Sequence, residues 1–320
     1  MRKPQKTNSR PKRLYRVKNW KVYEQALVER GSLMFWLGSD FEQSWKYTGK
    51  KQRGSQYDYS EQAILVMQTL KNLFHLPNRA TEGLMRSIFG MLQIALSVPD
   101  HSTLSRRAKT LKVCLPKKMK GHVDIVLDST GLKLYGEGEW KVWKHGVSKW
   151  RSWRKLHIGF DPNSAEIQAA SLTSNSVSDD QMLEALLTQV QQPITRVIGD
   201  GSYDTRKVYT YLKQHLPTAQ VLIPPRPAAR IWQHGNTQAQ PLARDENLRA
   251  IRKRGKKTWK QTSGYHARSL VETTFFRLKT IFGDRLSARL LETQITQVLV
   301  RCATLNRMTQ LGMPQSFVVA

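Results

Sequence analysis

Residues 264–279, GYHARSLVETTFFRLK, carry four polar side chains at regular spacing, namely Tyr265, Arg268, Glu272 and Lys279. Intervals of three, four and seven residues place all four on one face of a helix, because an α-helix repeats every 3.6 residues. That face would present one carboxylate among two cations and a phenol hydroxyl. Such a surface can bind a metal and grip a phosphate. The alternative is a solvated helix face on which these side chains form ion pairs with one another. The spacing taken alone favours this alternative.

Two aspartates are placed where predicted strands end. Asp128 closes the run VDIVLD (123–128), and Asp200 follows RVIG (196–199). An apolar strand that runs into a lone carboxylate is costly unless the acid is paired or bound to a metal. With Glu272, these acids would supply hard oxygen ligands, which suit Mg²⁺ or Mn²⁺ rather than zinc. Each acid taken alone could instead cap a helix or pair with an arginine.

The chain around these acids predicts a mixed α/β sheet. The predicted strands are 123–128, 131–135 after a tight turn, 155–160 and 166–172 around the turn DPNS, 196–198, and 221–223. The predicted helices are 179–190, 205–214, 266–282 and 290–311. A meander of strands followed by alternating strands and helices is typical of a mixed sheet.

Three stretches together carry a family resemblance: VLDSTGLK (126–133), IGDGSYD (198–204) and the Y-x2-R-x3-E-x6-K motif that begins at Tyr265. They resemble bacterial insertion-sequence transposases of the DDE class, especially those of the fourth and fifth insertion-sequence families. The resemblance covers roughly residues 59–311. The motif combined with both aspartates in order is hard to reach by chance.

The resemblance implies a ribonuclease H-like mixed-sheet catalytic domain. It implies that three catalytic acids bind two Mg²⁺ or Mn²⁺ ions: Asp128, Asp200 and Glu272. It also implies that three residues contact transposon-end DNA: Tyr265, Arg268 and Lys279. Such an enzyme binds terminal inverted repeats, cleaves the DNA ends with divalent metal, and joins the 3′-hydroxyls to target DNA by transesterification. A homodimer in the DNA complex is a family-level expectation.

The region before the sheet predicts a helical DNA-binding domain over residues 21–120, ahead of a catalytic domain over 121–320. Helices are predicted at 19–30, 59–76 and 80–92, followed by the basic helix STLSRRAKTLK, which Ser102 can cap. A helix, a turn and a basic helix resemble a helix-turn-helix, in which Arg106 and Arg107 would contact DNA. An ordinary helical bundle with a charged outer face is an equal alternative.

Three further basic segments predict broad contact with DNA. Residues 1–20 form a basic arm without acids, which could follow a phosphate backbone or be a solvated flexible tail. Residues 140–154 interleave cations with tryptophans, among them Trp143 and Trp153, which could stack on bases or pack in a core. Residues 224–264 form a basic loop without clear periodicity, either functional or disordered.

The composition agrees with a polyanionic partner. Fifty-two basic and 24 acidic residues give a net charge of +28. A compact chain this basic repels itself, and nucleic acid is the commonest partner that offsets such repulsion. A membrane is excluded as partner because no apolar run approaches the ~20 residues that a spanning helix needs. Two cysteines without metal-ligand spacing predict a reducing compartment, and we expect a cytoplasmic, nucleoid-associated protein.

Two other functions fit parts of this pattern. One is a DNA-binding protein that keeps the scaffold without catalysis, which the intact set of six motif residues argues against. The other is a ribonuclease H-like nuclease or resolvase that cuts branched DNA without joining ends. The helical motif and the separate N-terminal helical region disfavour this second alternative.

Overall fold

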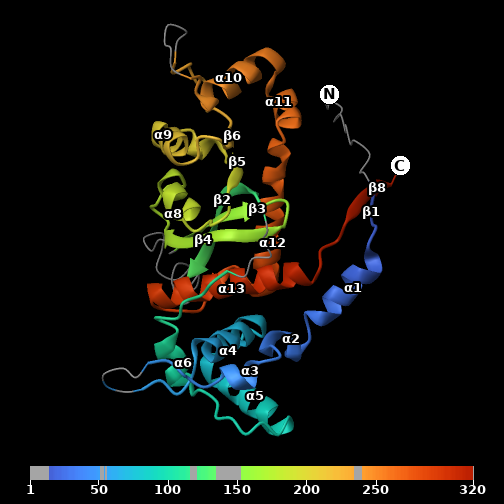
Figure 1. Ribbon diagram of the computed structural model, residues 1–320, viewed down its shortest axis with the longest axis vertical. Helices are drawn as coiled ribbons and strands as arrows, with labels where there is room; N and C mark the ends of the chain where they lie inside the picture. The colour runs from blue at the N-terminus through green and yellow to red at the C-terminus, as the bar shows by residue number, and fades with distance from the viewer. Residues whose placement is uncertain are drawn as a thin grey trace, which may run out of the picture.

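A computed structural model describes residues 14–50, 54, 56–115, 121–134, 153–233 and 240–319, and a mixed sheet forms its centre (Figure 1). Its strands are β2 (Val123–Leu134), β3 (Trp153–Asp161), β4 (Glu166–Ser174), β5 (Ile194–Ile198), β6 (Gln220–Leu222) and β7 (Arg285–Leu286). The order is β4-β3-β2-β5-β6, with β7 beside the end of β2. β2, β3 and β4 are antiparallel neighbours, whereas β5 and β6 run parallel to β2. This is the ribonuclease H-like order, so the predicted α/β fold class is confirmed.

The alternation of side chains along β2 decides what faces the two sides of the sheet. Val123, Ile125 and Leu127 pack in one apolar cluster with α8 (Leu183–Leu187) and α9 (Arg206–His215). Val126 points to the opposite face, where α12 (Ser269–Phe282) and α13 (Leu291–Leu311) complete a second cluster. Because strand side chains alternate with period two, Asp128 shares the face of Val126 and is directed toward the α12 side.

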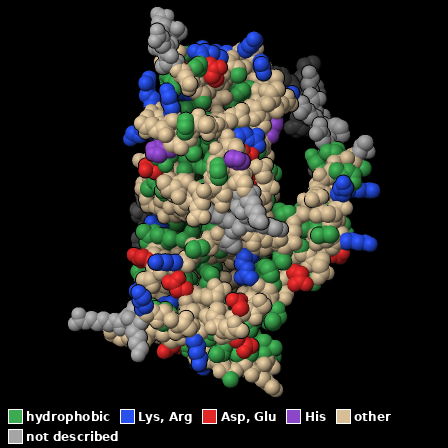
Figure 2. Space-filling view, viewed as in Figure 1, with side chains coloured by type: hydrophobic (Ala, Val, Ile, Leu, Met, Phe, Trp, Pro, Cys, Tyr) green, Lys and Arg blue, Asp and Glu red, His purple; other side chains and the backbone are tan. Residues whose placement is uncertain are grey.

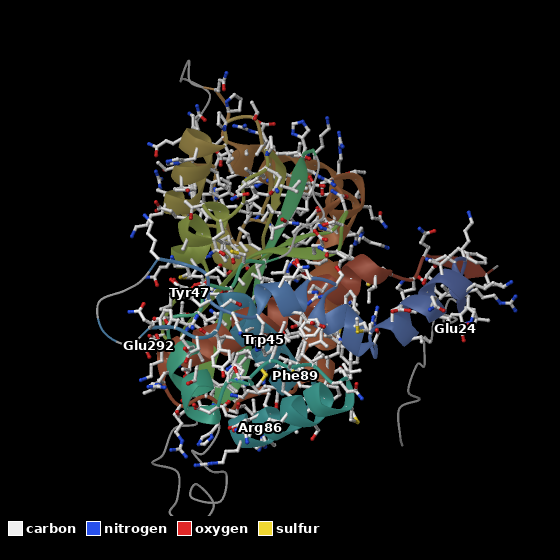
Figure 3. The ribbon with its side chains drawn as sticks, turned by 60° about the horizontal axis from the view of Figure 1, so that its bottom comes forward. Glu24, Trp45, Tyr47, Arg86, Phe89 and Glu292 are labelled. Atoms are coloured by element: carbon white, nitrogen blue, oxygen red, sulfur yellow. The ribbon has the colours of Figure 1, made fainter. Side chains whose placement is uncertain are left out.

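A separate group of helices lies on the other side of α13 (Figure 1). They are α2 (Leu33–Leu37), α3 (Phe41–Ser44), α4 (Glu61–Leu73), α5 (Asn78–Met91) and α6 (His101–Arg107), whereas α1 (Trp20–Glu29) lies beyond one end of α13. Their core includes Trp45 and Phe89, whose ring centroids are 5.1 Å apart (Figure 3), and it also takes in Met308 of α13. α13 therefore contributes to the apolar core beside the sheet and also to the core of the helical part. No helix in the described ranges combines the length and apolar character required to span a bilayer.

The basic helix near Ser102 differs from its predicted form. Asp100, not Ser102, caps α6, because its Oδ1 accepts hydrogen bonds from the backbone N–H groups of Ser102 and Thr103, both at 2.7 Å. Residues 92–100 separate α5 from α6. This connection is longer than the three- to four-residue turn of a helix-turn-helix. The predicted helix-turn-helix geometry is therefore wrong for this pair of helices.

The predicted arm is partly ordered into a strand. β1 (Leu14–Val17) pairs antiparallel with β8 (Ser316–Val319), so segments from the two ends of the sequence lie side by side (Figure 1). The backbone groups of residues 14–17 thus form hydrogen bonds with a strand that is far away in the sequence. No pattern within residues 14–17 predicts this pairing. The prediction of a flexible arm is wrong for these residues, and residues 1–13 lie outside the described ranges.

The turn predicted before residue 131 is absent, because β2 continues through Gly131 to Leu134. A Cβ at Gly131 would lie 3.1 Å from the Trp153 ring, so the glycine makes room for an aromatic side chain on the neighbouring strand. The role of Gly131 in the fold is therefore close packing within a continuous strand.

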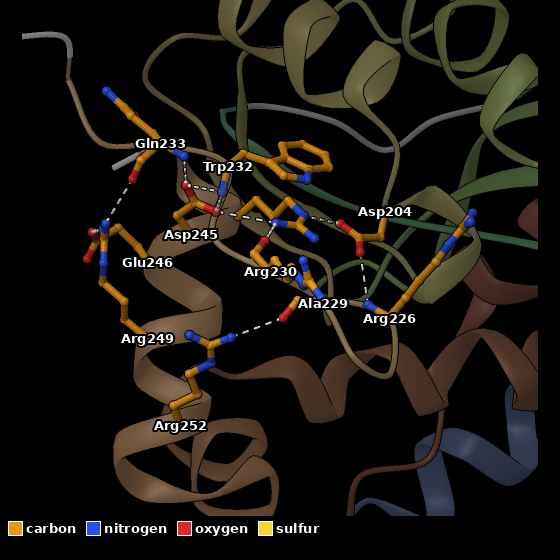
Figure 4. Close-up of polar contacts among 11 residues, drawn as sticks. Asp204, Arg226, Ala229, Arg230, Trp232, Gln233, Asp245, Glu246, Arg249 and Arg252 are labelled. Atoms are coloured by element: carbon orange, nitrogen blue, oxygen red, sulfur yellow. Dashed lines mark hydrogen bonds and ion pairs between the residues drawn. The ribbon is translucent and has the colours of Figure 1, made fainter. Parts of the chain in front are cut away.

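The basic segment 224–264 contains two helices, α10 (Ala243–Arg254) and α11 (Lys256–Thr262), contrary to the predicted loop. Buried Arg244 donates to Asp204 Oδ1 at 2.7 Å and to the Arg230 carbonyl at 2.8 Å (Figure 4). Asp245 accepts the backbone N–H of Trp232 at 3.1 Å. The inner face of α10 is thus formed largely by charged and polar residues. A search for apolar residues at helical spacing therefore could not predict this helix.

Candidate active site

The three predicted acids converge on a single guanidinium. Nη2 of Arg268 lies 2.9 Å from Asp128 Oδ2 and 3.9 Å from Asp200 Oδ2. Nη1 of the same side chain lies 3.2 Å from Glu272 Oε1. Carboxylates from a strand, a loop and a helix therefore surround one cation.

Strand pairing explains why the two aspartates meet. Val126 on β2 pairs with Ile198 on the parallel strand β5, so Asp128 and Asp200 are each two residues beyond this pair. Asp200 then caps the 3₁₀ helix η2 (Gly201–Tyr203) by accepting the backbone N–H of Ser202 at 2.8 Å. Asp128 lies in the middle of β2, which continues to Leu134, whereas Asp200 follows the carboxyl end of β5, and the parallel pairing of the two strands brings the two aspartates together.

Burial and charge act in opposite directions on Asp128. Burial raises the pKa of its carboxyl group, the Asp200 and Asp179 carboxylates raise it further, and the Arg268 guanidinium opposes them. Burial lowers the pKa of Arg268, but the surrounding carboxylates outweigh it and hold that pKa above its ordinary value. The cluster is thus an acidic site held together by one internal cation.

The predicted single helix face is divided between two elements. Tyr265 and Arg268 belong to the 3₁₀ helix η3 (Tyr265–Arg268), and α12 begins only at Ser269. Tyr265 is buried with its ring centroid 5.3 Å from that of Trp259, and burial raises the pKa of its hydroxyl to about 12. Lys279 is half-buried on α12, about 10 Å along the axis from Glu272. The structure therefore brings Arg268 and Glu272 together with the aspartates, whereas Lys279 lies apart from them.

Gly264 sets the start of η3. Its φ of +79° is in the left-handed region, and a Cβ there would lie 2.8 Å from Arg196 Nη1. Any other residue would meet backbone strain at this φ, and its Cβ would require the end of the Arg196 side chain to shift. The glycine thereby fixes where the chain turns to bring Arg268 toward the sheet.

A second polar cluster supports the two aspartates and was missed from the sequence. Asp179 Oδ1 lies 2.9 Å from Lys155 Nζ and 3.2 Å from His157 Nδ1, both on β3. Ser202 donates its hydroxyl to Asp200 Oδ1 and also approaches Asp179 Oδ2 at 3.4 Å. Despite burial, hydrogen bonds from His157, Lys155 and Ser129 hold the pKa of Asp179 below its usual range. The signal in the sequence that could have predicted this cluster is the spacing of Lys155 and His157, which places both side chains on one face of the same strand.

Other predicted DNA contacts have different surroundings. Arg107 is buried, donates to the Tyr59 carbonyl at 2.8 Å and lies over the Tyr57 ring at 4.0 Å, so the prediction of a DNA contact is wrong for this residue. Arg106 is exposed on α6. Trp153 packs beside β2, with Lys133 Nζ 5.7 Å from its ring centroid. Trp143 lies outside the described residues.

The donor set suits a hard divalent cation. The three acids supply only oxygen ligands, and all lie within 4 Å of one cationic group. In their present arrangement, no three His, Cys, Asp or Glu side chains of the described ranges are close enough to one another to hold a metal. The site therefore fits a divalent metal in chemistry, provided that the Arg268 guanidinium moves out of the centre.

Comparison with solved structures gives distant likenesses. One is to "Drosophila P element transposase strand transfer complex", at 13% identity and a TM-score of 0.32, covering 55% of this chain and 43% of that chain. Another is to "Cryo-EM structure of piggyBac transposase synaptic complex with hairpin DNA (SNHP)", at 9% identity and a TM-score of 0.37, covering 88% and 75%. The chain thus spans less than half of the P element chain.

Two family models match the sequence, and both describe a transposase DDE domain. The first covers residues 28–137 and the second residues 119–307. The second alone spans more than half of the chain and contains all three acids of the cluster. The chain therefore belongs to the transposase DDE-domain family.

Proposed function

We propose that this protein is a DNA transposase that binds the terminal inverted repeats of an insertion sequence, cleaves the DNA ends and joins the 3′-hydroxyls to target DNA. The convergence of Asp128, Asp200 and Glu272 around one cationic centre is the observation that carries this proposal. It occurs in a chain of the transposase DDE-domain family.

In this proposal the three acids are catalytic and would hold two Mg²⁺ or Mn²⁺ ions. When bound, such ions activate an attacking oxygen and stabilise the leaving oxygen of a phosphodiester. Asp128 is held within β2 by strand pairing, and Asp200 is held by the backbone hydrogen bond with which it caps η2, whereas the Glu272 side chain is 64% exposed. The two held aspartates and the exposed glutamate would align the reacting groups, which is the main contribution of the protein to such chemistry.

DNA contacts would come from several surfaces. Arg268 would hold a phosphate near the acids, Lys279 would hold a phosphate farther along α12, and Tyr265 would also contact the transposon-end DNA. Lys and Arg side chains also gather over α10 at one end of the molecule (Figure 2), where the last turn of that helix holds Arg252, Lys253 and Arg254. Phosphate contacts of this kind fix register and orientation rather than sequence.

The remaining assignments follow from this function. Residues 21–120 would form the main part of a DNA-binding domain and residues 121–320 the catalytic domain. Trp143, between β2 and β3 in the sequence, and Trp153, the first residue of β3, would also contact DNA. Because two ends must be joined to one target, we propose a homodimer in the DNA complex. We also propose that the protein acts in the bacterial cytoplasm, in association with the nucleoid, because its proposed substrate is DNA.

The test uses purified protein and a duplex that carries the inverted repeats flanking the gene. Wild-type protein with Mg²⁺ should nick the end and transfer the 3′-hydroxyl to a target plasmid, whereas D128N, D200N and E272Q should retain DNA binding without nicking. Cleavage by all three variants at wild-type rates would refute the site. Binding without strand transfer at any metal concentration would favour a non-catalytic DNA-binding protein. Cutting of branched DNA irrespective of end sequence would favour a nuclease.

A further inference from the structure

A basic cleft of about 1060 Å³ lies between the helical part and the catalytic part. One wall comes from α4–α6 and the other from the segment that joins α12 to α13. Its lining includes the cations Lys71, Arg79, Arg106, Arg285 and Arg301. The cleft is therefore distinct from the acidic cluster, which lies beside the middle of β2.

The charge of this cleft is poorly compensated. Asp284, an acid in its lining, already forms an ion pair with Lys133 Nζ at 2.8 Å. His101, also in the lining, has its own partner in Glu82, 3.0 Å away. Within the described ranges, no carboxylate forms an ion pair with Lys71, Arg106 or Arg301. Lys71, Arg106 and Arg301 therefore bring to the cleft three positive charges that no ion pair within the described ranges neutralises.

Two of these cations are held where burial makes them costly. Arg301 is only 4% exposed, and its guanidinium donates to neutral acceptors, Asn72 Oδ1 at 3.0 Å and the Gly283 carbonyl at 3.5 Å. Burial, followed by the charge of Arg301, lowers the pKa of Lys71. Two desolvated like charges without a counter-ion destabilise a fold, so an anion in this cleft would relieve both costs.

The form of the cleft indicates an extended anion. Ser102, Ser105 and Arg106 of α6 line it together, and their spacing places them on one helix face. This face adds the Ser105 hydroxyl and the exposed Arg106 guanidinium to the cations on the opposite wall, whereas the Ser102 hydroxyl already donates to Asp100 Oδ1 at 2.7 Å. A DNA backbone with successive phosphates would use both walls, whereas one inorganic anion would use only one end.

We propose that this cleft binds the phosphodiester backbone of duplex DNA, with Lys71 and Arg301 gripping one phosphate and Arg79, Arg106 and Arg285 its neighbours. The inference rests on the proposed function for the identity of the DNA as a transposon end. It assigns the junction between the helical and catalytic parts, rather than α6 alone, as the surface that fixes the duplex relative to the acids.

The experiment compares K71M with K213M, which removes an exposed lysine from α9. Binding of a fluorescent end duplex is measured by anisotropy in EDTA over a series of salt concentrations. One lost phosphate contact should lower the slope of log K against log salt by about 0.9, which weakens binding about eightfold at 0.1 M salt. K213M should leave the slope unchanged. Equal slopes for wild type and K71M would overturn the proposal.

Stability provides a readout that distinguishes binding from a purely structural role. Without DNA, K71M should have a Tm equal to or above that of wild type, because it removes a desolvated cation repelled by Arg301. A lower Tm with an unchanged slope would assign Lys71 to the fold and refute the proposal. If K71M does not fold, R79Q replaces it, because Arg79 is exposed at the cleft margin, and the same loss of slope is expected.

Two further arms separate the sources of the anion and the two proposals. Inorganic phosphate should raise the Tm of wild type far less than the duplex does. Protection by phosphate alone, with equal DNA slopes, would mean a small-anion site and would overturn the proposal. D128N should bind DNA with the wild-type slope and fail to nick. If D128N still nicks the DNA end, the proposed function is refuted. If D128N is inactive but the salt dependence of K71M binding equals that of wild type, only the proposal that the cleft binds DNA is refuted.

Discussion

Replacing Arg268 with methionine should make the acids bind divalent metal more tightly while impairing cleavage. The guanidinium occupies the point on which Asp128, Asp200 and Glu272 converge, so a divalent cation must displace it. Methionine keeps much of the length and removes the charge. We therefore expect Mn²⁺ affinity to rise and the rate of DNA cleavage to fall, because the variant loses both a charge that competes with the metal and a proposed phosphate contact.

The magnitude follows from the ion-pair geometry. With an effective dielectric constant of about 20, charges separated by the 2.9 Å between Arg268 and Asp128 attract by roughly 6 kcal/mol before any desolvation is counted. The side chains of Arg268 and Glu272 are 23% and 64% exposed, so solvent screening and side-chain entropy reduce the net interaction substantially. We take about 1–2 kcal/mol, which corresponds to about 5- to 30-fold in Mn²⁺ affinity.

The assay is a titration with Mn²⁺ followed by electron paramagnetic resonance of the free ion, with the protein in the absence of DNA. R249M is the matched control, because it breaks an exposed ion pair with Glu246 at 2.6 Å on α10. It should leave Mn²⁺ affinity unchanged. A folded R268M protein that binds Mn²⁺ no more tightly than wild type would refute the competition between arginine and metal.

Three other changes test separate parts of the structure. D179N should weaken Mn²⁺ affinity about 10-fold, because Asp179 approaches Ser202, which orients Asp200. The control is D124N, which changes an aspartate near the other end of β2. Equal Mn²⁺ affinities of D179N and wild type would contradict this link. R244M should lower the free energy of unfolding by about 3–5 kcal/mol in urea denaturation, since it leaves buried Asp204 unpaired. Hydrogen bonds from Ser102 and Thr103 lower the pKa of Asp100 from 3.8 to about 2, so its stabilising effect is complete above about pH 4 and disappears as the pH falls toward 2. D100N should keep the cap without this acid sensitivity, and identical Tm profiles of D100N and wild type between pH 4 and 2 would contradict it.

The sequence was sufficient to predict the central sheet and the acids because those signals are local. The apolar run before Asp128 and the strand before Asp200 are strong β patterns, and the parallel pairing of β2 with β5 then brings both aspartates close together. The four-residue motif predicted a helix that carries Glu272. It did not predict that η3 precedes this helix, since a short 3₁₀ turn has no period of its own.

The features that could not be predicted depend on distant partners. α10 has a polar inner face because Arg244 meets Asp204, which is 40 residues earlier in the sequence. Arg107 is buried because the Tyr59 carbonyl and the Tyr57 ring receive it, although its position in a basic helix favoured solvent. The placement of Arg268 among the three acids likewise depends on tertiary packing. Charged residues with long side chains are therefore the ones whose roles the sequence leaves open.

The pairing of β1 with β8 has a consequence for synthesis of the chain. Their paired residues, such as Leu14 and Val319, are about 300 positions apart. At about 5–20 residues per second, the first strand emerges from the ribosome roughly 15–60 s before its partner exists. Throughout that interval β1 has no strand to pair with, so its backbone N–H and C=O groups form hydrogen bonds with water or other partners until β8 has been synthesised.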